Sequence, residues 1–435
     1  MSRRTFPSFA TKLPGYRFVA KDGNVPLLIV AVVGVAYANA LTASFQFDDW
    51  HVIVDHPAVH GLAAWWASMP GIRPLLKLSY ALNWTLSSSA LSFHLANVAI
   101  HAANACLILA LLAKRTARFA ALTTALLFAL HPVQTEAVTY VTGRSVSLSA
   151  LFVLGSLALA GWLSSAAFAS AILVKETAVM AAVPLILRKR AMGPLVVLLG
   201  AALIAAASPW YRHLLAVSLQ TRTIRTNLMT QAHAVVYLMG QLVRFDRLNA
   251  DPKLPELTAW SGQLFAETSL IVGLIVLGFA LWRRRPAVAF GILWFFLWLL
   301  PTNSILPRLD VANDRQLYIA MAGPAWLVAY GLGALAKKRR VFATVLVAVL
   351  CVVLATGTHR RNRVNADELT YWNDVVAKAP HNPRGFNNLG YALALADRND
   401  EADAAFRTAL SLDPGYVRAA VNLRLLREGA LMRRQ

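Results

Sequence analysis

Long apolar runs, separated by short polar or basic segments, dominate the pattern of residues along the chain. Residues 25–45 form the first of these runs, and residues 93–113 form the second. About 20 apolar residues are enough for a helix to cross the hydrocarbon core of a membrane. The pattern therefore predicts an all-α fold, a polytopic membrane helix bundle.

Counting the apolar runs gives about eleven spans. After the first two, the third span is expected from Phe119 to the segment HPVQTE, the fourth at 145–162, and the next two as short helices between 157 and 187. The remaining spans are expected at 194–210, 264–282, 287–300, 317–336 and 341–357. The two short helices are expected to meet near Lys175 and Glu176. An even number of crossings there returns the next basic segment to the side of the earlier ones.

Composition and charge agree with a membrane protein, since 57% of the residues are hydrophobic and only 14% are charged. The net charge of +21 comes largely from basic clusters in short loops. These clusters lie at residues 3–4, 114–118, 188–190, 283–285 and 337–340. Basic loops of this kind are typical of the cytoplasmic side. The pattern therefore predicts a cytoplasmic N-terminal tail, residues 1–24, and no nucleic-acid partner, because no nucleic-acid motif is visible.

Two features limit other interpretations. The first apolar run is too long for a signal-peptide core and lacks a convincing cleavage site, so we expect it to remain as a span. Cys106 and Cys351 both lie inside apolar runs and indicate neither a disulfide framework nor a cysteine metal site. The basic segment 359–363 would lie outside and is an exception to the charge rule.

The end of the chain is polar and contains a repeat of 34 residues, the tetratricopeptide period. The pairs at this spacing are Trp372 with Phe406, Pro380 with Pro414, Arg384 with Arg418 and Asn388 with Asn422. We therefore expect a transmembrane domain at 25–357, with an external loop at 46–92, followed by an external tetratricopeptide-like domain at 358–435. Such a domain typically binds a polypeptide partner.

Candidate chemistry begins where the first apolar run ends, in SFQFDDWHVIVDHPAVHG. Asp48 and Asp49 are adjacent carboxylates just outside the expected span, and one such group can act as a general base. A divalent cation beside them stays an open alternative, although the spacing of the nearby ligand types matches no strong pattern. Those residues are His51, Asp55, His56 and His60.

Cations suited to an anionic head group lie in other external loops. Arg73 and Lys77 are four residues apart, downstream of the aspartates. Arg315 follows a later loop, in which Arg308 has solvation as its simpler interpretation. The segment AVHGLAAWWASM between the aspartates and Arg73 predicts a short helix that lies in the membrane interface.

Polar residues also occur within the expected spans. His94, Asn97, His101 and Asn104 are spaced 3, 4 and 3 residues apart, so they share one face of the second span. Lipid disfavours such a face, which either lines a functional cavity or bonds helices together. His101 is a candidate for substrate binding, whereas Asn104 fits both interpretations.

Three further candidates, His131, Glu136 and Arg144, lie near the external ends of the third and fourth spans. The simpler alternative is a buried pair between Glu136 and Arg144 that holds the helices together. Lys175 and Glu176 are the only charges between 157 and 187, which makes both of them candidates as well.

Several segments together resemble one family. They are FDDWHVIVDHPAVHG, RPLLKLSYALNW, FHLANVAIH, LFALHPVQTEAVTYVTGR, LVKETAVMAAVP, RLNADPKLP, LPTNSILP, DRQLYIA and the tetratricopeptide tail. The chain resembles the transmembrane-and-tetratricopeptide O-mannosyltransferases, of the GT-C class, over almost its whole length. It departs from the family pattern at Gln134, where a second histidine is usual, at Ser145 and Val146, and at Asp314.

The resemblance implies a GT-C-like transmembrane domain that moves a hexose, expected to be mannose, from a polyprenyl-phosphate carrier to a protein hydroxyl on the external face, with inversion. Asp48 or Asp49 would be the base, with Asp48 preferred. Residues expected to bind the donor phosphate or substrate are Arg73, Lys77, His101, His131, Glu136, Arg144, Lys175, Glu176 and Arg315. No residue is assigned as a metal ligand.

Other classes of protein stay open. A non-enzymatic membrane scaffold would use the tail to recruit a partner, and an oligosaccharide ligase would use a diphosphate-linked glycan. A transporter would show internal repeats among the spans, and none is visible. The Ala- and Arg-rich composition suggests a bacterium, so we expect an inner-membrane protein with a periplasmic active site and C-terminus. In a eukaryote, the external side would instead be the lumen of the endoplasmic reticulum.

Overall fold

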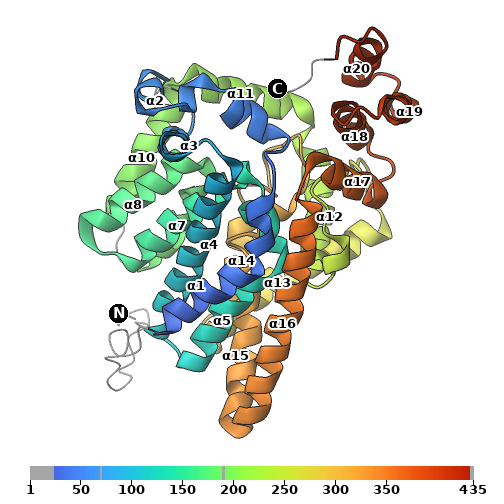
Figure 1. Ribbon diagram of the computed structural model, residues 1–435. Coiled ribbons are helices and arrows are strands. Elements are labelled where there is room, and N and C mark those ends of the chain that lie inside the picture. The colour runs from blue at the N-terminus through green and yellow to red at the C-terminus, as the bar shows by residue number, and fades with distance from the viewer. Residues whose placement is uncertain (1–23, 69–70, 189–191, 432–435) are drawn as a thin grey trace.

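The computed structural model describes residues 24–68, 71–188 and 192–431, and those residues form helices and no strands. The expected all-α class is thus confirmed. The expected N-terminal tail falls outside the described residues, apart from residue 24. In chain order the α-helices (Figure 1) are α1 (Asn24–Ala36), α2 (Leu62–Ser68), α3 (Pro74–Leu86), α4 (Ala90–Ala113), α5 (Arg118–Leu130), α6 (Thr135–Val138), α7 (Arg144–Ala158), α8 (Gly161–Val174), α9 (Ala182–Leu187), α10 (Met192–Ala207), α11 (Pro209–Thr221), α12 (Ile224–Gln241), α13 (Gly262–Leu281), α14 (Pro286–Leu299), α15 (Ala322–Lys338), α16 (Arg340–Val364), α17 (Glu368–Lys378), α18 (Pro383–Leu395), α19 (Asn399–Leu412) and α20 (Val417–Arg427).

Length and composition qualify four stretches of the described chain as membrane spans, namely α4, Val141–Ala158, α13 and α16. The pair α10 and α11, bent by 80° at a short break, raises the number to five if it counts as one span. Most of the other expected spans coincide with shorter apolar helices, among them α1, α5, α8 and α14. The span expected at 317–336 corresponds to α15, which belongs to neither group. The criterion of a full-length apolar helix therefore does not support about eleven spans.

Local breaks explain most of the difference. The first expected span, residues 25–45, is helical only to Ala36 and continues as the 3-10 segment η1 (Ala38–Thr42). The expected meeting of two short helices at Lys175 is confirmed, because α8 ends at Val174 and the 3-10 segment η6 (Glu176–Ala181) follows. The stretch between the spans expected at 194–210 and 264–282 contains α12, an 18-residue helix that hydropathy does not predict.

Apolar side chains cover the outer faces of the longest helices. On α13, Phe265 and Phe279 are 68% and 65% exposed, and on α16 Val341 is 79% exposed. Water disfavours apolar surface of this extent, whereas the hydrocarbon core of a bilayer accommodates it. The helix bundle is therefore a membrane domain with lipid-facing sides.

Small residues allow two of the helices to approach closely. A Cβ atom added at Gly323 on α15 would lie 2.4 Å from the backbone oxygen of Gly291 on α14. Glycine therefore has a packing reason at both positions, as is common between membrane helices.

The last four helices, α17 to α20, form a C-terminal unit with its own apolar core. Trp372 on α17 and Phe406 on α19, which the 34-residue spacing paired, both lie in this core. Helix α16 continues without a break to Val364, so the expected boundary at residue 358 falls inside a helix. Arg361, from the basic segment that broke the charge rule, forms an ion pair with Asp374 of α17 at 2.5 Å.

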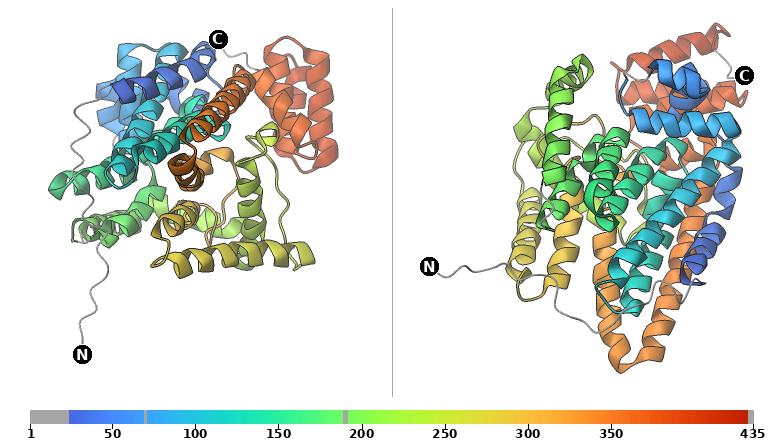
Figure 2. Two further views of the ribbon diagram at one scale, coloured as in Figure 1. Left: turned by 90° about the horizontal axis from the view of Figure 1, so that it is seen from below. Right: turned by 90° about the vertical axis from the view of Figure 1, so that its left-hand side faces the viewer.

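The two ends of the bundle differ in what they carry. The C-terminal unit, α2 and α3 lie together at one end (Figure 1), and the turn between α15 and α16 lies at the opposite end. The side view in Figure 2 places the turn between α13 and α14 at that opposite end as well. Those two turns hold the basic clusters 283–285 and 337–340, as expected for loops on a common side.

Candidate active site

The loop between η1 and the short π-helix η2 (Trp50–Val54) carries the two aspartates, and hydrogen bonds fix its backbone. The N–H group of Gln46 donates to Asp49 Oδ2 at 3.0 Å, and that of Phe47 donates to Glu368 Oε1 at 2.7 Å. The N–H group of Asp48 donates to the hydroxyl oxygen of Tyr140 at 3.1 Å. Each of these N–H groups thus bonds to a side chain, which orders a segment with little regular structure.

The two carboxylates have different surroundings. Asp49 is 1% exposed and also accepts the N–H group of Thr142 at 2.8 Å. Burial raises the pKa of Asp49 to about 7, although these N–H groups act to lower it. Asp48 is half-buried, and within the described part of the chain its carboxylate has no hydrogen-bond or ion-pair partner.

Asp48 lines a cavity that we call the acidic cavity, with an empty volume of about 370 Å³. Its other lining residues are Phe47, Glu136, Tyr140, Ala250, Asp251, Asp310, Arg315, Tyr371, Trp372 and Arg384. Four of the residues that line this cavity are carboxylates. Arg384 is committed to two of them, Asp251 at 2.5 Å and Asp310 at 2.8 Å. Asp48 is therefore the carboxylate of this cavity that stays available to a ligand.

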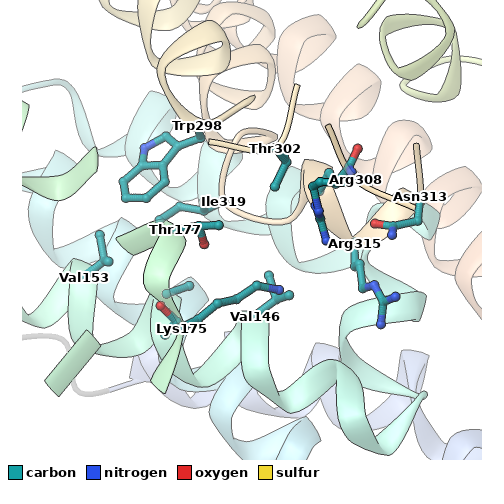
Figure 3. Close-up of a pocket in the computed structure, with 13 residues that line it drawn as sticks. Val146, Val153, Lys175, Thr177, Trp298, Thr302, Arg308, Asn313, Arg315 and Ile319 are labelled. Atoms are coloured by element: carbon teal, nitrogen blue, oxygen red, sulfur yellow. The ribbon is translucent and has the colours of Figure 1, made fainter. Parts of the chain in front are cut away.

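A second cavity, the basic cavity, has an empty volume of about 520 Å³ (Figure 3). Lys175, Arg308 and Arg315 supply its cations. In Figure 3, Trp298 and Val153 lie on one side of this cavity, and Arg308 and Arg315 lie on the other. The cavity thus combines an apolar side with a cationic side.

Arg315 lines both cavities and lies in the 3-10 segment η8 (Asp314–Leu317). The side-chain Nε of Arg315 lies 3.4 Å from Glu136 Oε1, and the backbone N–H group of Arg315 donates to Glu136 Oε2 at 2.8 Å. Burial raises the pKa of Glu136, while the charge of Arg315 opposes that shift. Glu136 therefore pairs with Arg315, and the alternative pair with Arg144 does not form.

The cations around the basic cavity influence one another. Burial lowers the pKa of Lys175 well below its usual value, and Arg73, Arg315 and Arg308 lower it further. Burial and repulsion of this kind favour the uncharged form of Lys175, and an anion in the cavity would favour its charged form. Arg308, whose simpler interpretation was solvation, is part of this cationic group.

Buried polar atoms without partners also face the basic cavity. Asn313, 2% exposed, leaves both Nδ2 and Oδ1 without a hydrogen bond within the described structure, and Gln316 leaves Nε2 and Oε1. Buried polar groups are rarely left unpaired. These side chains are therefore suited to a polar ligand between them and Lys175.

Arg73 lies near the site but does not line either cavity. It has φ = 53°, in the left-handed region, and its Nη2 lies 2.9 Å from Glu176 Oε2. Lys77 follows on α3, and its Nζ lies 2.6 Å from the place of a Cβ added at Gly71. Arg73 thus lies beside the site, with Glu176 as its ion-pair partner, whereas Lys77 lines neither cavity.

The structure places three other candidates in the packed interior. His101 Nδ1 contacts the Tyr318 hydroxyl at 2.8 Å, and its Nε2 contacts the Ala129 carbonyl at 3.0 Å. His131, directly after α5, contacts the Leu242 carbonyl oxygen through its Nε2 at 3.0 Å. These two histidines line neither cavity, an arrangement that favours the helix-packing alternative.

Arg144 is the third of these, with 1% exposure. Its guanidinium donates to Asn97 Oδ1 at 2.6 Å, to Asn83 Oδ1 at 2.8 Å and to the Phe93 carbonyl at 3.0 Å. Its Cζ also lies 5.1 Å from the centre of the Tyr80 ring. Arg144 therefore holds α3, α4 and α7 together rather than facing a cavity.

The residues considered for a divalent cation do not converge. His60 stacks on Trp84, with ring centres 3.9 Å apart. In the described ranges, no group of three or more His, Cys, Asp or Glu side chains is arranged to hold a metal ion. A divalent cation beside Asp48 therefore stays an alternative that the described residues neither define nor test.

Sequence reasoning missed several residues of the site. Asp251 lines the acidic cavity, and its segment RLNADPKLP contributes to the sequence prediction only through the resemblance. The sequence places Arg384, Tyr371 and Trp372 in a separate external domain, although they line the acidic cavity. Their contact with the membrane domain depends on the tertiary fold, which the repeat pattern alone does not reveal.

Known relatives match different lengths of the chain. Protein O-mannosyl-transferase TMTC3 of Mus musculus is 35% identical over 145 residues, which are 30% of this chain and 16% of that protein. Protein O-mannosyl-transferase TMTC4 of Homo sapiens is 30% identical over 159 residues, 29% of this chain and 22% of that protein. Protein O-mannosyl-transferase F38B6.6 of Caenorhabditis elegans is 24% identical over 440 residues, 90% of this chain and 63% of that protein.

No family model matches the chain, and no solved structure matches it. The chain spans between 16% and 63% of the length of the relatives named above. Those relatives come from animals, so they do not support the bacterial inner membrane that the composition suggested. They do confirm the resemblance carried by the motifs: the chain is similar to the protein O-mannosyl-transferases of the TMTC group.

Proposed function

We propose that this protein is an integral-membrane glycosyltransferase that moves a hexose, mannose, from a polyprenyl phosphate to a hydroxyl group of a protein. The observation that carries the proposal is the position of Arg315. It lines the basic cavity with Lys175 and Arg308, and it lines the acidic cavity with Asp48, whose carboxylate has no partner among the described residues. A phosphate on one side of Arg315 would bring a sugar toward the carboxylate on the other side.

The chemical step needs a base and a way to stabilise the leaving group. The acceptor oxygen bonds to the anomeric carbon of the sugar while the carboxylate of Asp48 takes the hydroxyl proton. The bond between the anomeric carbon and the phosphate oxygen breaks, and the phosphate keeps the electron pair. Attack from the face opposite the phosphate inverts the anomeric centre.

The basic cavity suits the developing charge. A polyprenyl phosphodiester carries one negative charge, and the departing phosphate carries more as the bond breaks. Lys175, Arg308 and Arg315 surround the cavity and would stabilise that charge more strongly in the transition state than in the ground state. The apolar side at Val153 and Trp298 suits the first isoprene units of the carrier.

The two aspartates take different roles in this proposal. The carboxylate of Asp49 is occupied by the N–H groups of Gln46 and Thr142, so it fixes the loop. Asp48 lines the acidic cavity, and its carboxylate bonds to no described residue, so it is the base. These roles do not require a divalent cation. Comparing transfer with and without EDTA tests whether a cation takes part.

We also propose that the site opens on the extracytoplasmic side of the membrane. The basic turns lie at the end of the bundle opposite the C-terminal unit, and basic loops favour the cytoplasm. The acidic cavity is lined in part by that unit. A protein acceptor would therefore meet the sugar outside the cytoplasm.

Transfer with purified protein tests this function. The protein is incubated with peptides containing Ser and Thr and with one donor at a time: polyprenyl-phosphate mannose, polyprenyl-phosphate glucose, a polyprenyl-diphosphate oligosaccharide, or GDP-mannose. Mass spectrometry then locates any added hexose, with and without EDTA. We expect transfer from polyprenyl-phosphate mannose. Transfer from the diphosphate donor alone would indicate a ligase, and none from any donor, with peptide binding retained, would indicate a scaffold.

A further inference from the structure

Helix α17 contacts the residue directly before Asp48. The N–H group of Phe47 donates to Glu368 Oε1 at 2.7 Å, at the first residue of α17. One helical turn later, the ring of Trp372 packs edge to face against the ring of Phe47, with centres 5.2 Å apart. Both the backbone and the side chain of Phe47 are thus held by the C-terminal unit.

The connection between α16 and α17 adds two more bonds to the same loop. The N–H group of Ser44 donates to the Ala366 carbonyl at 3.0 Å, and the side-chain amide of Gln46 donates to the Asn365 carbonyl at 2.5 Å. These residues are more than 300 positions apart in the sequence. The loop before Asp48 is therefore fixed largely by the last part of the chain.

Phe47 needs such support because of its backbone. Its φ is 44°, in the left-handed region that side chains with a Cβ rarely adopt. A conformation of this kind persists only where surrounding contacts hold it. The bond to Glu368 and the packing against Trp372 are the contacts that do so from outside the loop.

We propose that α17 positions the base of the reaction: Glu368 and Trp372 are positioning residues that orient Asp48 through Phe47. This inference rests on the function proposed above, and it gives the C-terminal unit a direct part in the transfer step. The unit is then a wall of the active site as well as a surface for a protein partner.

A second helix of the unit supports this assignment. Arg384 on α18 bonds Asp251 and Asp310, which both line the acidic cavity, and Asn382 donates to the Asp251 carbonyl at 3.0 Å. The C-terminal unit thus holds three separate segments of the membrane domain around one cavity. A module that only recruited a partner would not need these contacts.

Hydrogen–deuterium exchange on the full-length protein tests the positioning role without any assay of transfer. Glu368→Ala removes the acceptor of the Phe47 N–H group. Because that amide then loses its bond to a charged carboxylate, we expect the amides of residues 44–50 to exchange roughly tenfold faster. Glu368→Gln keeps an acceptor oxygen and should restore slow exchange. Glu401→Ala, which removes a paired and exposed carboxylate elsewhere in the unit, is the matched control.

Kinetics provide the second readout. Glu368→Ala should lower kcat by roughly tenfold and leave the KM for the donor within about twofold, because the base is misplaced while the basic cavity is intact. Phe47→Leu, which keeps the C-terminal unit unchanged and loses the ring contact, should act in the same direction. Glu401→Ala should match the wild type.

Two results would overturn the inference. One is unchanged exchange at residues 44–50 in both Glu368→Ala and Phe47→Leu. The other is a loss of activity that appears only in KM, which would assign α17 to acceptor binding. If the wild type transfers no sugar, the proposed function fails, and the exchange measurement still decides whether α17 orders this loop.

Discussion

Asp49 accepts a hydrogen bond of 2.8 Å from the backbone N–H group of Thr142, and so ties the loop after η1 to the turn that precedes α7. The resemblance leaves the base open between Asp48 and Asp49, with Asp48 preferred. The structure separates them, because Asp49 is buried and bonded while Asp48 faces a cavity. In the proposed reaction, Asp49 stabilises the loop and Asp48 acts as the base, which would explain why two aspartates are adjacent here.

The pKa of Asp49 leads to a prediction about stability and pH. Burial raises this pKa from 3.8 to about 7, so between these values the folded protein binds a proton that the unfolded chain has released. The contribution of Asp49 to the free energy of unfolding is therefore complete below about pH 4 and falls until the pH passes about 7. Asn at this position has no proton to lose, so Asp49→Asn should lack this loss.

Thermal unfolding in detergent measures this effect as a difference between two proteins. We expect the midpoint of Asp49→Asn, relative to that of the wild type, to rise as the pH goes from 5 to 8. Comparing the two proteins at each pH removes the titration of all other groups. A constant difference across this range would contradict a raised pKa at Asp49.

Lys175 should matter for the donor. Lys175→Met keeps most of the side-chain volume and removes one cation of the basic cavity. We expect kcat/KM for the lipid-linked sugar to fall roughly 10- to 100-fold, as is typical when a group that stabilises developing charge is lost. Lys338→Met, at the opposite end of the bundle, should have no effect. Equal kinetics in the two variants would exclude Lys175 from phosphate binding.

Arg144 should matter for stability. Arg144→Lys keeps the charge but loses the planar fork that reaches Asn83, Asn97 and the Phe93 carbonyl. We expect a loss of about 2–3 kcal/mol in the free energy of unfolding, because buried acceptors lose their donors. Thermal unfolding should show a lower midpoint, and the protein that stays folded should keep its kcat. A normal midpoint with lost transfer would instead support the phosphate-binding role expected from the resemblance.

Cysteine labelling checks the orientation of the site. In a background without Cys106 and Cys351, single cysteines are introduced at Ser88, at Asp400 in the C-terminal unit, and at Arg284 between α13 and α14. We expect a membrane-impermeant maleimide to label the first two from outside intact cells or right-side-out vesicles, and the third only after permeabilisation. Labelling of all three from one side would contradict the proposed arrangement.

The sequence predicts some parts of this molecule better than others. Hydropathy identifies α4 and α13 closely, because a long apolar run is a local property. The break at Lys175 is predicted because the only charges of its apolar stretch lie there, and because an even number of membrane crossings is needed. Hydropathy does not reveal that the first helix ends at Ala36, since apolar residues continue beyond it as a 3-10 segment.

The partners of charged residues are harder to predict. Glu136 pairs with Arg315 rather than with Arg144, which is nearer in the sequence, and Arg73 pairs with Glu176. Such pairs depend on how distant segments fold together, which neither spacing nor residue type specifies. For the same reason the contact between Phe47 and Glu368 has no signal in the sequence of either segment.

In the proposed reaction, the carboxylate of Asp48 removes the proton of the acceptor hydroxyl. Asp48→Asn is nearly isosteric and leaves the bonds of Asp49 and Glu368 to the loop in place. The most direct test is the kcat of Asp48→Asn for mannose transfer from polyprenyl phosphate to a peptide. It is compared with that of the wild type after thermal unfolding has shown that the two proteins are equally stable. We predict a fall of roughly 10²- to 10⁴-fold. Transfer by Asp48→Asn at close to the wild-type rate would contradict the account.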